Sequence, residues 1–178
     1  MYFKSSGPSH TTETVRLALA KAAEYGIKDI VIASRTGQTA KLLAGQQLNV
    51  ICVTHVQGFA QAGQNEMDEE TRRQLVDQGM KVLTTTHVLS GVERSMSKKF
   101  GGIYPVEIIA NTLRMFGQGV KVCVEVAVMA LDAGLIPHDK EIIAIGGTGV
   151  GVDTAVIIRP GHASATFDTF ISEIICKP

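Results

Sequence analysis

Apolar residues along the chain alternate between a helical spacing and short continuous runs. Between Thr11 and Tyr25 they recur at the i, i+3, i+4 and i+7 positions of one helix face, and Gly26 follows as a stop. Ile27–Ser34 is then a β-branched run of the kind that forms a buried strand. The same alternation predicts further helices over residues 37–45, 65–79, 90–101, 105–116 and 118–132, and further strands over residues 49–55, 81–87, 141–145 and 153–159.

Several expected helix starts carry capping residues. Thr11 or Thr12 can cap the first helix, and Asn65 can cap the acidic helix that follows it. Ser90 and Glu93 have the spacing of a capping box, in which each side chain satisfies the backbone amide of the other residue. These signals support the helical spacing at three separate places in the chain.

Strands that alternate with helices predict an α/β domain with a mainly parallel sheet that is covered on both faces. Residues 146–152, between the last two expected strands, are too few for a helical crossover, so the fifth strand should run antiparallel. The apolar tail 167–175 is expected to pack back on the domain. In such a sheet ligands bind beyond the carboxyl ends of the parallel strands, here Ser34, His55, His87 and Gly146.

Composition and charge favour one globular domain over residues 1–178 and exclude several functions. The chain has 178 residues, of which 45% are hydrophobic, and its 17 basic and 17 acidic residues leave no net charge. Sequence-independent binding of nucleic acid needs a basic excess, and so does polybasic docking on a membrane. We therefore expect neither a nucleic-acid partner nor a membrane partner.

The cysteines and the N-terminal segment indicate a soluble cytoplasmic protein. Cys52, Cys123 and Cys176 are odd in number and far apart, which favours reduced, buried thiols over a disulfide, a redox pair or a zinc site. The residues after Met1 do not form the apolar core of a signal peptide. Charged residues interrupt the most apolar stretch, residues 120–135, which is also too short to span a bilayer.

The first strand end carries the most informative chemistry. The segment Ser34-Arg35-Thr36-Gly37-Gln38-Thr39 lies between a strand and a helix, where the two threonine hydroxyls and the free amides of residues 37–39 would converge. Unpaired donors and the positive end of a helix dipole attract an anion, above all phosphate. The loop lacks the Gly-Lys-Ser/Thr ending of a Walker A motif. The alternative is a plain turn whose hydroxyls only cap the helix.

A second glycine-rich segment follows the fourth strand. Gly147, Thr148 and Gly149 do not belong to the G-x-G-x-x-G spacing of a dinucleotide fingerprint, and a strand rather than a helix follows them. The small residues would instead let a flat or phosphorylated ligand approach the backbone, with Asp153 and Thr154 beside it. The alternative is a tight connection that contacts no ligand.

Two histidines end neighbouring strands directly after threonines, as Thr54-His55 and Thr86-His87. This placement would bring both imidazoles to one cleft, where either could act as a general acid or base because histidine titrates near neutrality. A hydrogen-bonding or structural role is the alternative for each. No third ligand at metal spacing accompanies them, so we expect no metal.

Charged residues in the helices leave several roles open. Glu125 lies in the middle of an apolar helix, where it either pairs with Lys121 four residues earlier or faces a ligand. Arg94 and Arg114 either meet a phosphate or carboxylate or form surface ion pairs. No Ser-His-Asp order, Cys-His pair or carboxylate cluster predicts catalytic residues. The chain therefore offers a binding site more clearly than a reaction centre.

The strand–Ser–x–Thr–Gly–x–Thr–Ala–helix unit at residues 34–40 resembles the C-terminal α/β domain of pyruvate kinases, where the corresponding loop receives a phosphate of the sugar-bisphosphate effector. Further motifs resemble a stand-alone group, the archaeal and bacterial pyruvate-kinase alpha/beta-domain-like proteins. These motifs are Thr54-His55, Gly58-Phe59, Thr86-His87 and residues 90–94, 100–107 and 146–149. The similarity runs from Phe3 to Pro178. It implies a three-layer α/β/α sandwich with a mostly parallel five-stranded sheet of order 3-2-1-4-5, in which strand five is antiparallel.

The resemblance also implies a function. Pyruvate kinases hold their catalytic residues in a separate barrel domain, so we expect no pyruvate kinase activity from these 178 residues. Flavin mononucleotide (FMN) is the ligand that the resemblance favours, with its phosphate at residues 34–39 and its ring near Thr54, His55, Thr86, His87 and residues 147–154. The alternatives are another phosphorylated ligand, a flavin-dependent or phosphometabolite-converting enzyme that uses either histidine, and a regulatory domain. Such a domain would sense a sugar phosphate and act through contacts in a homo-oligomer.

Overall fold

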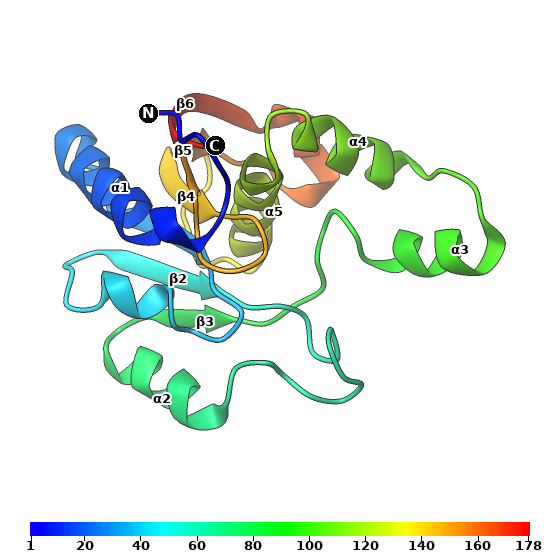
Figure 1. Ribbon diagram of the computed structural model, residues 1–178, viewed down its shortest axis with the longest axis horizontal. Helices are drawn as coiled ribbons and strands as arrows, with labels where there is room; N and C mark the ends of the chain where they lie inside the picture. The colour runs from blue at the N-terminus through cyan, green and yellow to red at the C-terminus, as the bar shows by residue number, and fades with distance from the viewer.

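The computed structural model describes residues 1–178 and contains one sheet with helices on both of its faces (Figure 1). The strands are β1 (Asp29–Ala33), β2 (Asn49–Val53), β3 (Lys81–Leu83), β4 (Ile142–Gly146), β5 (Thr154–Arg159) and β6 (Phe170–Cys176). The helices are α1 (Thr11–Tyr25), α2 (Glu69–Asp77), α3 (Val92–Phe100), α4 (Pro105–Arg114) and α5 (Gln118–Asp132). Short 3-10 turns occupy Pro8–His10, Ala40–Leu43 and Ala163–Asp168. None of the helices has the length and apolar character needed to cross a membrane.

The sheet has the strand order β3-β2-β1-β4-β5-β6. β1 pairs in parallel with β2 and β4, β2 pairs in parallel with β3, and β5 runs antiparallel to β4. The expected order of the first five strands and the antiparallel fifth strand are therefore confirmed. Ala33 pairs with Val53, and Val53 pairs with Leu83, so three parallel strands end at the same edge of the sheet.

The C-terminal tail forms a sixth strand, where we expected only an apolar segment packed on the domain. β6 runs antiparallel to β5, from Cys176 opposite Ala155 to Phe170 opposite Arg159. Two register shifts interrupt this ladder. They disturb the two-residue alternation by which a strand is recognised in a sequence.

Two helical layers cover the sheet and complete a three-layer α/β/α sandwich. Ala18 of α1 packs with Ile32 in the core on one face, and Leu75 of α2 joins the same core. Ala127 of α5 packs with Val31 in a second core on the opposite face. Neighbouring residues of β1 enter different cores because successive side chains of a strand point to opposite faces of the sheet. α5 is apolar nearly all round because the sheet covers one of its sides and α4 packs on it as well.

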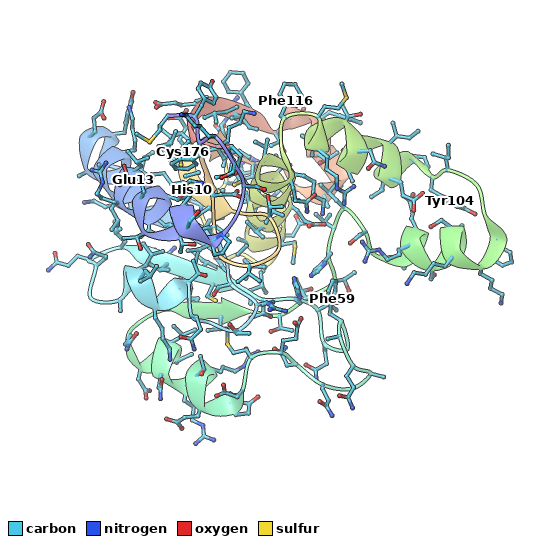
Figure 2. All side chains as sticks on the ribbon, in the orientation of Figure 1. His10, Glu13, Phe59, Tyr104, Phe116 and Cys176 are labelled. Carbon is cyan, nitrogen blue, oxygen red and sulfur yellow. The ribbon has the colours of Figure 1, made fainter.

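An arm made of α3 and α4 extends away from the sandwich (Figure 1). α3 buries none of its residues, and α4 buries only Ala110. Tyr104 and Phe116 lie in the turns before and after α4, and Figure 2 shows Tyr104 far out on this arm. The arm connects β3 to α5 and carries two arginines that reach the site described below.

The acidic helix begins later than expected. α2 starts at Glu69, and its N-cap is Asp68, whose carboxylate accepts a hydrogen bond from the Thr71 amide at 2.7 Å. The expected cap, Asn65, instead accepts a hydrogen bond from the Met67 amide at 2.8 Å, in a turn before the helix. Either side chain can serve as a cap, so only the path of the chain decides which one meets the helix start.

The other two expected caps are also wrong, because both side chains bond to distant segments. α3 begins without a side-chain cap, and the carboxylate of Glu93 accepts a hydrogen bond from the Val106 amide at 2.9 Å, which ties α3 to the start of α4. α1 also begins without a side-chain cap, and the Thr11 hydroxyl accepts a hydrogen bond from the Val152 amide at 3.1 Å. In both cases a backbone amide from a distant segment occupies the side chain. A capping motif assumes instead that the amides of the same helix start do so.

Candidate functional site

A cavity of about 560 Å³ lies at the carboxyl ends of β1, β2 and β4. Its wall combines the loops after β1 and β4, residues that follow β2 and β3, and one face of α5. The predicted site residues that line it are Ser34, Thr36, Gln38, Thr39, Thr54, His55, His87, Gly147 and Gly149. The predicted residues outside its wall are Gly37, Thr86, Thr148, Asp153 and Thr154. The loops after β1 and β4 thus face each other across one cavity, as the strand order implied.

The loop after β1 presents unpaired hydrogen-bond donors. None of the backbone amides from Arg35 to Thr39 donates a hydrogen bond within the protein. The hydroxyls of Thr36 and Thr39, which line the cavity, also lack a protein partner. The Ser34 hydroxyl is buried and accepts a hydrogen bond from the Ala40 amide at 3.3 Å. Ser34 therefore shapes the loop, while the threonines and the amides remain available to a ligand.

The helix expected over residues 37–45 is not formed. Only one 3-10 turn, Ala40–Leu43, follows the loop. Gly37 and Gly45 bound this segment with left-handed φ angles of 83° and 74°, a conformation that an α-helix does not continue. Such a short turn has little macrodipole. Any affinity of the loop for an anion must come from its individual N–H and O–H groups.

The loop after β4 forms a wall of glycines. Gly147, Gly149 and Gly151 all line the cavity. A Cβ atom on Gly147 would lie 2.5 Å from a backbone oxygen of the same loop, and one on Gly151 would lie 2.9 Å from the Cα of Pro8. Local packing therefore leaves no room for a side chain at these two positions. This agrees with the alternative that the segment is a tight connection between two strands. A Cβ atom on Gly149 would meet nothing within 4 Å, so this residue borders open space.

Asp153 and Thr154 are fully buried behind this loop and do not reach the cavity. The Asp153 carboxylate accepts hydrogen bonds from the Gly7 amide at 3.0 Å and from the Thr154 hydroxyl at 2.9 Å. A Cβ atom on Gly119 would lie 2.0 Å from the Thr154 hydroxyl oxygen, so α5 starts directly against this pair. Both residues join the N-terminal segment and α5 to β5 and have no contact with the cavity.

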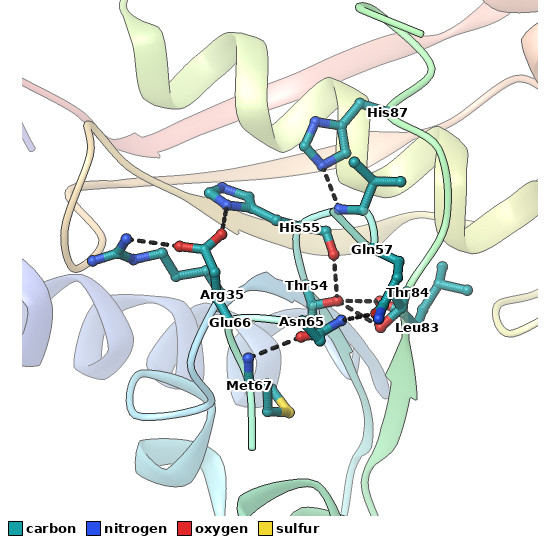
Figure 3. A network of polar contacts seen from close by, with 11 residues as sticks. Arg35, Thr54, His55, Gln57, Asn65, Glu66, Met67, Leu83, Thr84 and His87 are labelled. Carbon is teal, nitrogen blue, oxygen red and sulfur yellow. Dashed lines mark hydrogen bonds and ion pairs between the residues drawn. The ribbon is translucent and has the colours of Figure 1, made fainter. Parts of the chain in front are cut away.

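The two histidines come together in the cavity wall, with their ring centroids 5.5 Å apart. Nδ1 of His55 lies 2.5 Å from one carboxylate oxygen of Glu66, and Arg35 donates to the other oxygen at 2.9 Å (Figure 3). Phe59 contacts the His55 ring on another side, at a centroid distance of 4.0 Å. Glu66 and Phe59 follow β2 in an irregular loop. Nothing in the sequence indicated that Glu66 belongs to the site, and Phe59 was marked only as part of a motif of the family resemblance.

His87 and the Glu66 carboxylate beside His55 both have shifted pKa values, and the causes differ. Nε2 of His87 accepts a hydrogen bond from the Val56 amide at 3.2 Å (Figure 3). Burial lowers the pKa of His87, and the charge of Glu125 only partly opposes this effect. Burial raises the pKa of Glu66, but the hydrogen bonds that it accepts from His55 and Arg35, together with the positive charge beside it, outweigh this effect and hold the pKa below its ordinary value. The surroundings thus favour the anionic form of Glu66 and the neutral form of His87.

Thr54, the threonine next to His55, has a structural role. The Thr54 hydroxyl lies 2.7 Å from the Thr84 hydroxyl, which also accepts a hydrogen bond from Arg72 at 2.9 Å. These contacts hold the ends of β2 and β3 together. β3 ends at Leu83 and does not reach the expected His87, because β2 offers no pairing residue beyond Val53. Thr86 is exposed in the segment that leaves the sheet.

On α5, Lys121 and Glu125 form a buried ion pair in the cavity wall. Their side chains are only 5% and 7% exposed. The second carboxylate oxygen of Glu125 accepts a hydrogen bond from the Leu89 amide at 3.0 Å. Burial lowers the pKa of Lys121, although the carboxylate beside it favours the charged form. Glu125 therefore pairs with Lys121, as one of the two alternatives predicted, and it also lines the cavity.

Two arginines from the arm line the cavity and have no carboxylate partner. Arg114 donates hydrogen bonds to the side chains of Gln118 at 2.8 Å and Asn111 at 2.9 Å. Arg94 on α3 makes no side-chain hydrogen bond or ion pair. The surface ion pairs that were the alternative for both residues are not formed. Apolar residues of α5 complete this side of the wall, namely Val122, Val126 and Met129.

No group of three or more His, Cys, Asp or Glu side chains in the structure could hold a metal ion. The three cysteines are unpaired and buried, and burial raises the pKa of Cys52 to about 12. A thiol with such a pKa stays protonated and is a poor nucleophile. None of the three cysteines lines the cavity, whose charged and titratable groups are arginines, the two imidazoles and the Lys121–Glu125 pair.

Comparison with known proteins gives a family match over most of the chain. The family described as "Pyruvate kinase, alpha/beta domain" matches residues 12–158, which include both cavity loops and the two histidines. Two similar solved structures are pyruvate kinases from Cryptosporidium parvum, with sequence identities of 19% and 17% and TM-scores of 0.44 and 0.43. A third, the same organism's enzyme in complex with ADP, has 19% identity and a TM-score of 0.45.

These three structures cover 88%, 87% and 88% of this chain, respectively. The chain corresponds to only 23%, 23% and 24% of their lengths. The family match, in contrast, takes in α1 through β5 and thus most of the sandwich. On this match, the chain belongs to the pyruvate kinase alpha/beta domain family.

Proposed function

We propose that the protein binds a phosphorylated small molecule in this cavity. The supporting observation is that Thr36, Gln38 and Thr39 line a cavity that also contains Arg94 and Arg114. The amides of this loop from Arg35 to Thr39 and the hydroxyls of Thr36 and Thr39 are unpaired within the protein. Amide and hydroxyl donors suit the oxygens of a phosphate, and arginine binds phosphate in a bidentate manner. The cavity volume, about 560 Å³, falls within the usual range for small-molecule sites.

The balance of charge in the cavity favours an anion. Glu66 neutralises Arg35, and Glu125 neutralises Lys121. Arg94 and Arg114 have no such partner, so the cavity has a local positive excess in a chain whose formal net charge is zero. A local excess of this kind attracts anions in a cleft even where the protein as a whole has no field to steer them.

FMN is the specific ligand that we propose. The family resemblance singles it out, and the residues of the cavity fit its parts. The donors of residues 34–39 would hold its phosphate. The glycine wall and the apolar face of α5 would accept its flat ring, with Phe59 and the histidines nearby. When bound, FMN would supply redox chemistry, and this chain's own residues would bind and orient it and exclude water from it.

Titration of FMN with the purified protein tests this proposal, with quenching of flavin fluorescence as the measurement. We expect saturable quenching by the wild-type protein. The double variant Thr36→Ala, Thr39→Ala should bind FMN at least about tenfold more weakly, because two hydrogen bonds to a charged group are lost. Thr112→Ala is the matched control, since this threonine is exposed on α4 and its hydroxyl bonds only to the Ile108 carbonyl at 2.9 Å.

Two outcomes would contradict the proposal. If FMN does not bind to the wild-type protein, FMN is not the ligand. If the double variant binds FMN as tightly as wild type does, the phosphate does not occupy the loop after β1. Native mass spectrometry of freshly purified protein would identify a retained ligand and the number of subunits in the same measurement.

A further inference from the structure

The cavity contains a histidine that a carboxylate holds in a fixed orientation. Glu66 accepts a hydrogen bond from Nδ1 of His55 at 2.5 Å, and Arg35 fixes the other oxygen of this carboxylate at 2.9 Å. An ionised carboxylate can only accept, so Nδ1 carries the proton and Nε2 of the neutral ring has a free lone pair. Nε2 has no partner in the protein, and His55 lines the cavity. This arrangement is that of a general base supported by a carboxylate.

The second histidine has the complementary property. The Val56 amide donates to Nε2 of His87 at 3.2 Å, so this nitrogen carries no proton. In the neutral ring the proton is therefore on Nδ1, which has no protein partner either. A neutral imidazole can stabilise a developing oxyanion by donating a hydrogen bond to it while it keeps its own proton. The ring centroids are 5.5 Å apart, so a base and a neutral donor stand side by side.

We propose that this pair makes the cavity a site of proton transfer, in which His55 is the base and His87 the donor for enolisation of a phosphorylated carbonyl compound. Nε2 of His55 takes the proton from a C–H bond next to the carbonyl group. The electron pair of that bond forms a C=C bond, and the carbonyl π electrons move to the oxygen, which accepts the hydrogen bond from Nδ1 of His87. Return of the proton to carbon completes the cycle, and neither an oxidant nor a reductant is needed.

Other features of the cavity favour this reaction over covalent catalysis. No serine or cysteine side chain hydrogen-bonds to either imidazole, so neither histidine has a side-chain nucleophile to activate. Glu66 stabilises the imidazolium that forms on His55, and Arg94 and Arg114 would balance the charge of the substrate phosphate. This inference rests on the proposed function in its general form, a bound phosphorylated molecule, and does not depend on the choice of FMN.

Hydrogen–deuterium exchange with dihydroxyacetone phosphate as the probe tests the inference. In D₂O, the ¹H NMR signal of the hydroxymethyl group next to the carbonyl should disappear about a hundredfold faster with wild-type protein than in buffer. His55→Gln should lose this acceleration. Glu66→Gln should lower the saturating rate about tenfold and leave the half-saturating probe concentration unchanged, because Glu66 positions the base and does not touch the substrate. His138→Gln, an exposed histidine outside the cavity, should match wild type.

Binding of the probe is measured in parallel by saturation-transfer NMR, so the two proposals can fail separately. If dihydroxyacetone phosphate binds to the wild-type protein without exchange, the inference is overturned and the proposed phosphate site stands. If the probe does not bind at all, the phosphate site fails for this substrate class and the inference falls with it. Release of inorganic phosphate without exchange would show hydrolysis instead and also overturn it. The inference is supported if His55→Gln and Glu66→Gln keep a normal circular dichroism spectrum and bind the probe, while His55→Gln loses the exchange and Glu66→Gln slows it about tenfold.

Discussion

Lys121 and Glu125 form an ion pair in the wall of the cavity, one helical turn apart on α5, and their side chains are 5% and 7% exposed. The pair is buried because α5 is covered by the sheet on one side and by α4 on another. The Leu89 amide also donates to Glu125, at 3.0 Å, so this carboxylate holds the chain that leads from β3 into the arm. One buried carboxylate thus joins α5, a lysine of the cavity and the start of the arm.

We predict that Glu125→Gln lowers the free energy of unfolding by about 3–5 kcal/mol, because it leaves the charge of Lys121 buried without a partner. Glutamine keeps an acceptor for the Leu89 amide, so the loss reports mainly on the charge. The double variant Lys121→Met, Glu125→Gln removes both charges and should recover most of the lost stability. Urea unfolding measures both values. Equal instability of the single and double variants would contradict this explanation.

Arg94 should contribute directly to binding of a phosphorylated ligand. We predict that Arg94→Gln weakens the binding of FMN by about tenfold to a hundredfold, since a hydrogen bond to a charged group is worth about 1.5–3 kcal/mol. Lys98→Gln is the matched control, because Lys98 is exposed on the same helix and does not line the cavity. Fluorescence titration gives both affinities. The same loss in both variants would mean that the ligand senses only the charge of α3.

Gly37 should tolerate a side chain less well than Gly45, although both have left-handed φ angles. A Cβ atom on Gly37 would lie 2.6 Å from Cγ2 of Thr71, whereas one on Gly45 would meet nothing within 4 Å. We predict that Gly45→Ala costs about 1–2 kcal/mol through backbone strain alone. Gly37→Ala should cost a further ~1–3 kcal/mol, because the loop must move away from α2. Thermal unfolding of both variants tests this, and equal losses would show that Thr71 moves aside freely.

His87 should make the protein less stable in acid. Burial lowers its pKa from the ordinary value of 6.5, while Glu125 favours the charged form and His55, Lys121 and Arg94 oppose it. Below pH 6.5 the unfolded chain therefore binds a proton at this position before the folded chain does. The free energy of unfolding should fall as the pH drops from 6.5 through the lowered pKa.

We predict that His87→Gln reduces this dependence on pH, because glutamine does not titrate and can still accept the hydrogen bond from the Val56 amide. Urea unfolding of wild-type protein and the variant at a series of pH values below 6.5 measures the difference. Parallel pH profiles would show that other groups cause the loss of stability in acid.

The sequence predicted helix bounds most reliably where all the signals lie within the helix and the residues that flank it. α1 and α5 begin and end at the predicted residues, because each has a complete helical spacing between clear stops. The signals were misleading where a distant partner competes. Thr11, Glu93 and Asn65 all accept hydrogen bonds, but not those that a helix cap would make. β6 was missed for a related reason, since its register is set by β5.

The sequence by itself determined the α/β class, the order of the first five strands through the family resemblance, and the edge of the sheet at which the cavity lies. These features follow from residue spacing and from the rule that parallel strands end at one edge. Only the tertiary structure decided which polar groups share the cavity. It brought Glu66 to His55 and placed two arginines of the arm in the wall of the same cavity as the loop after β1, with Asp153 and Thr154 behind the wall. The physical reason is that a side chain's role depends on the donors and charges that folding brings within a few ångströms, and spacing along the chain does not encode those distances.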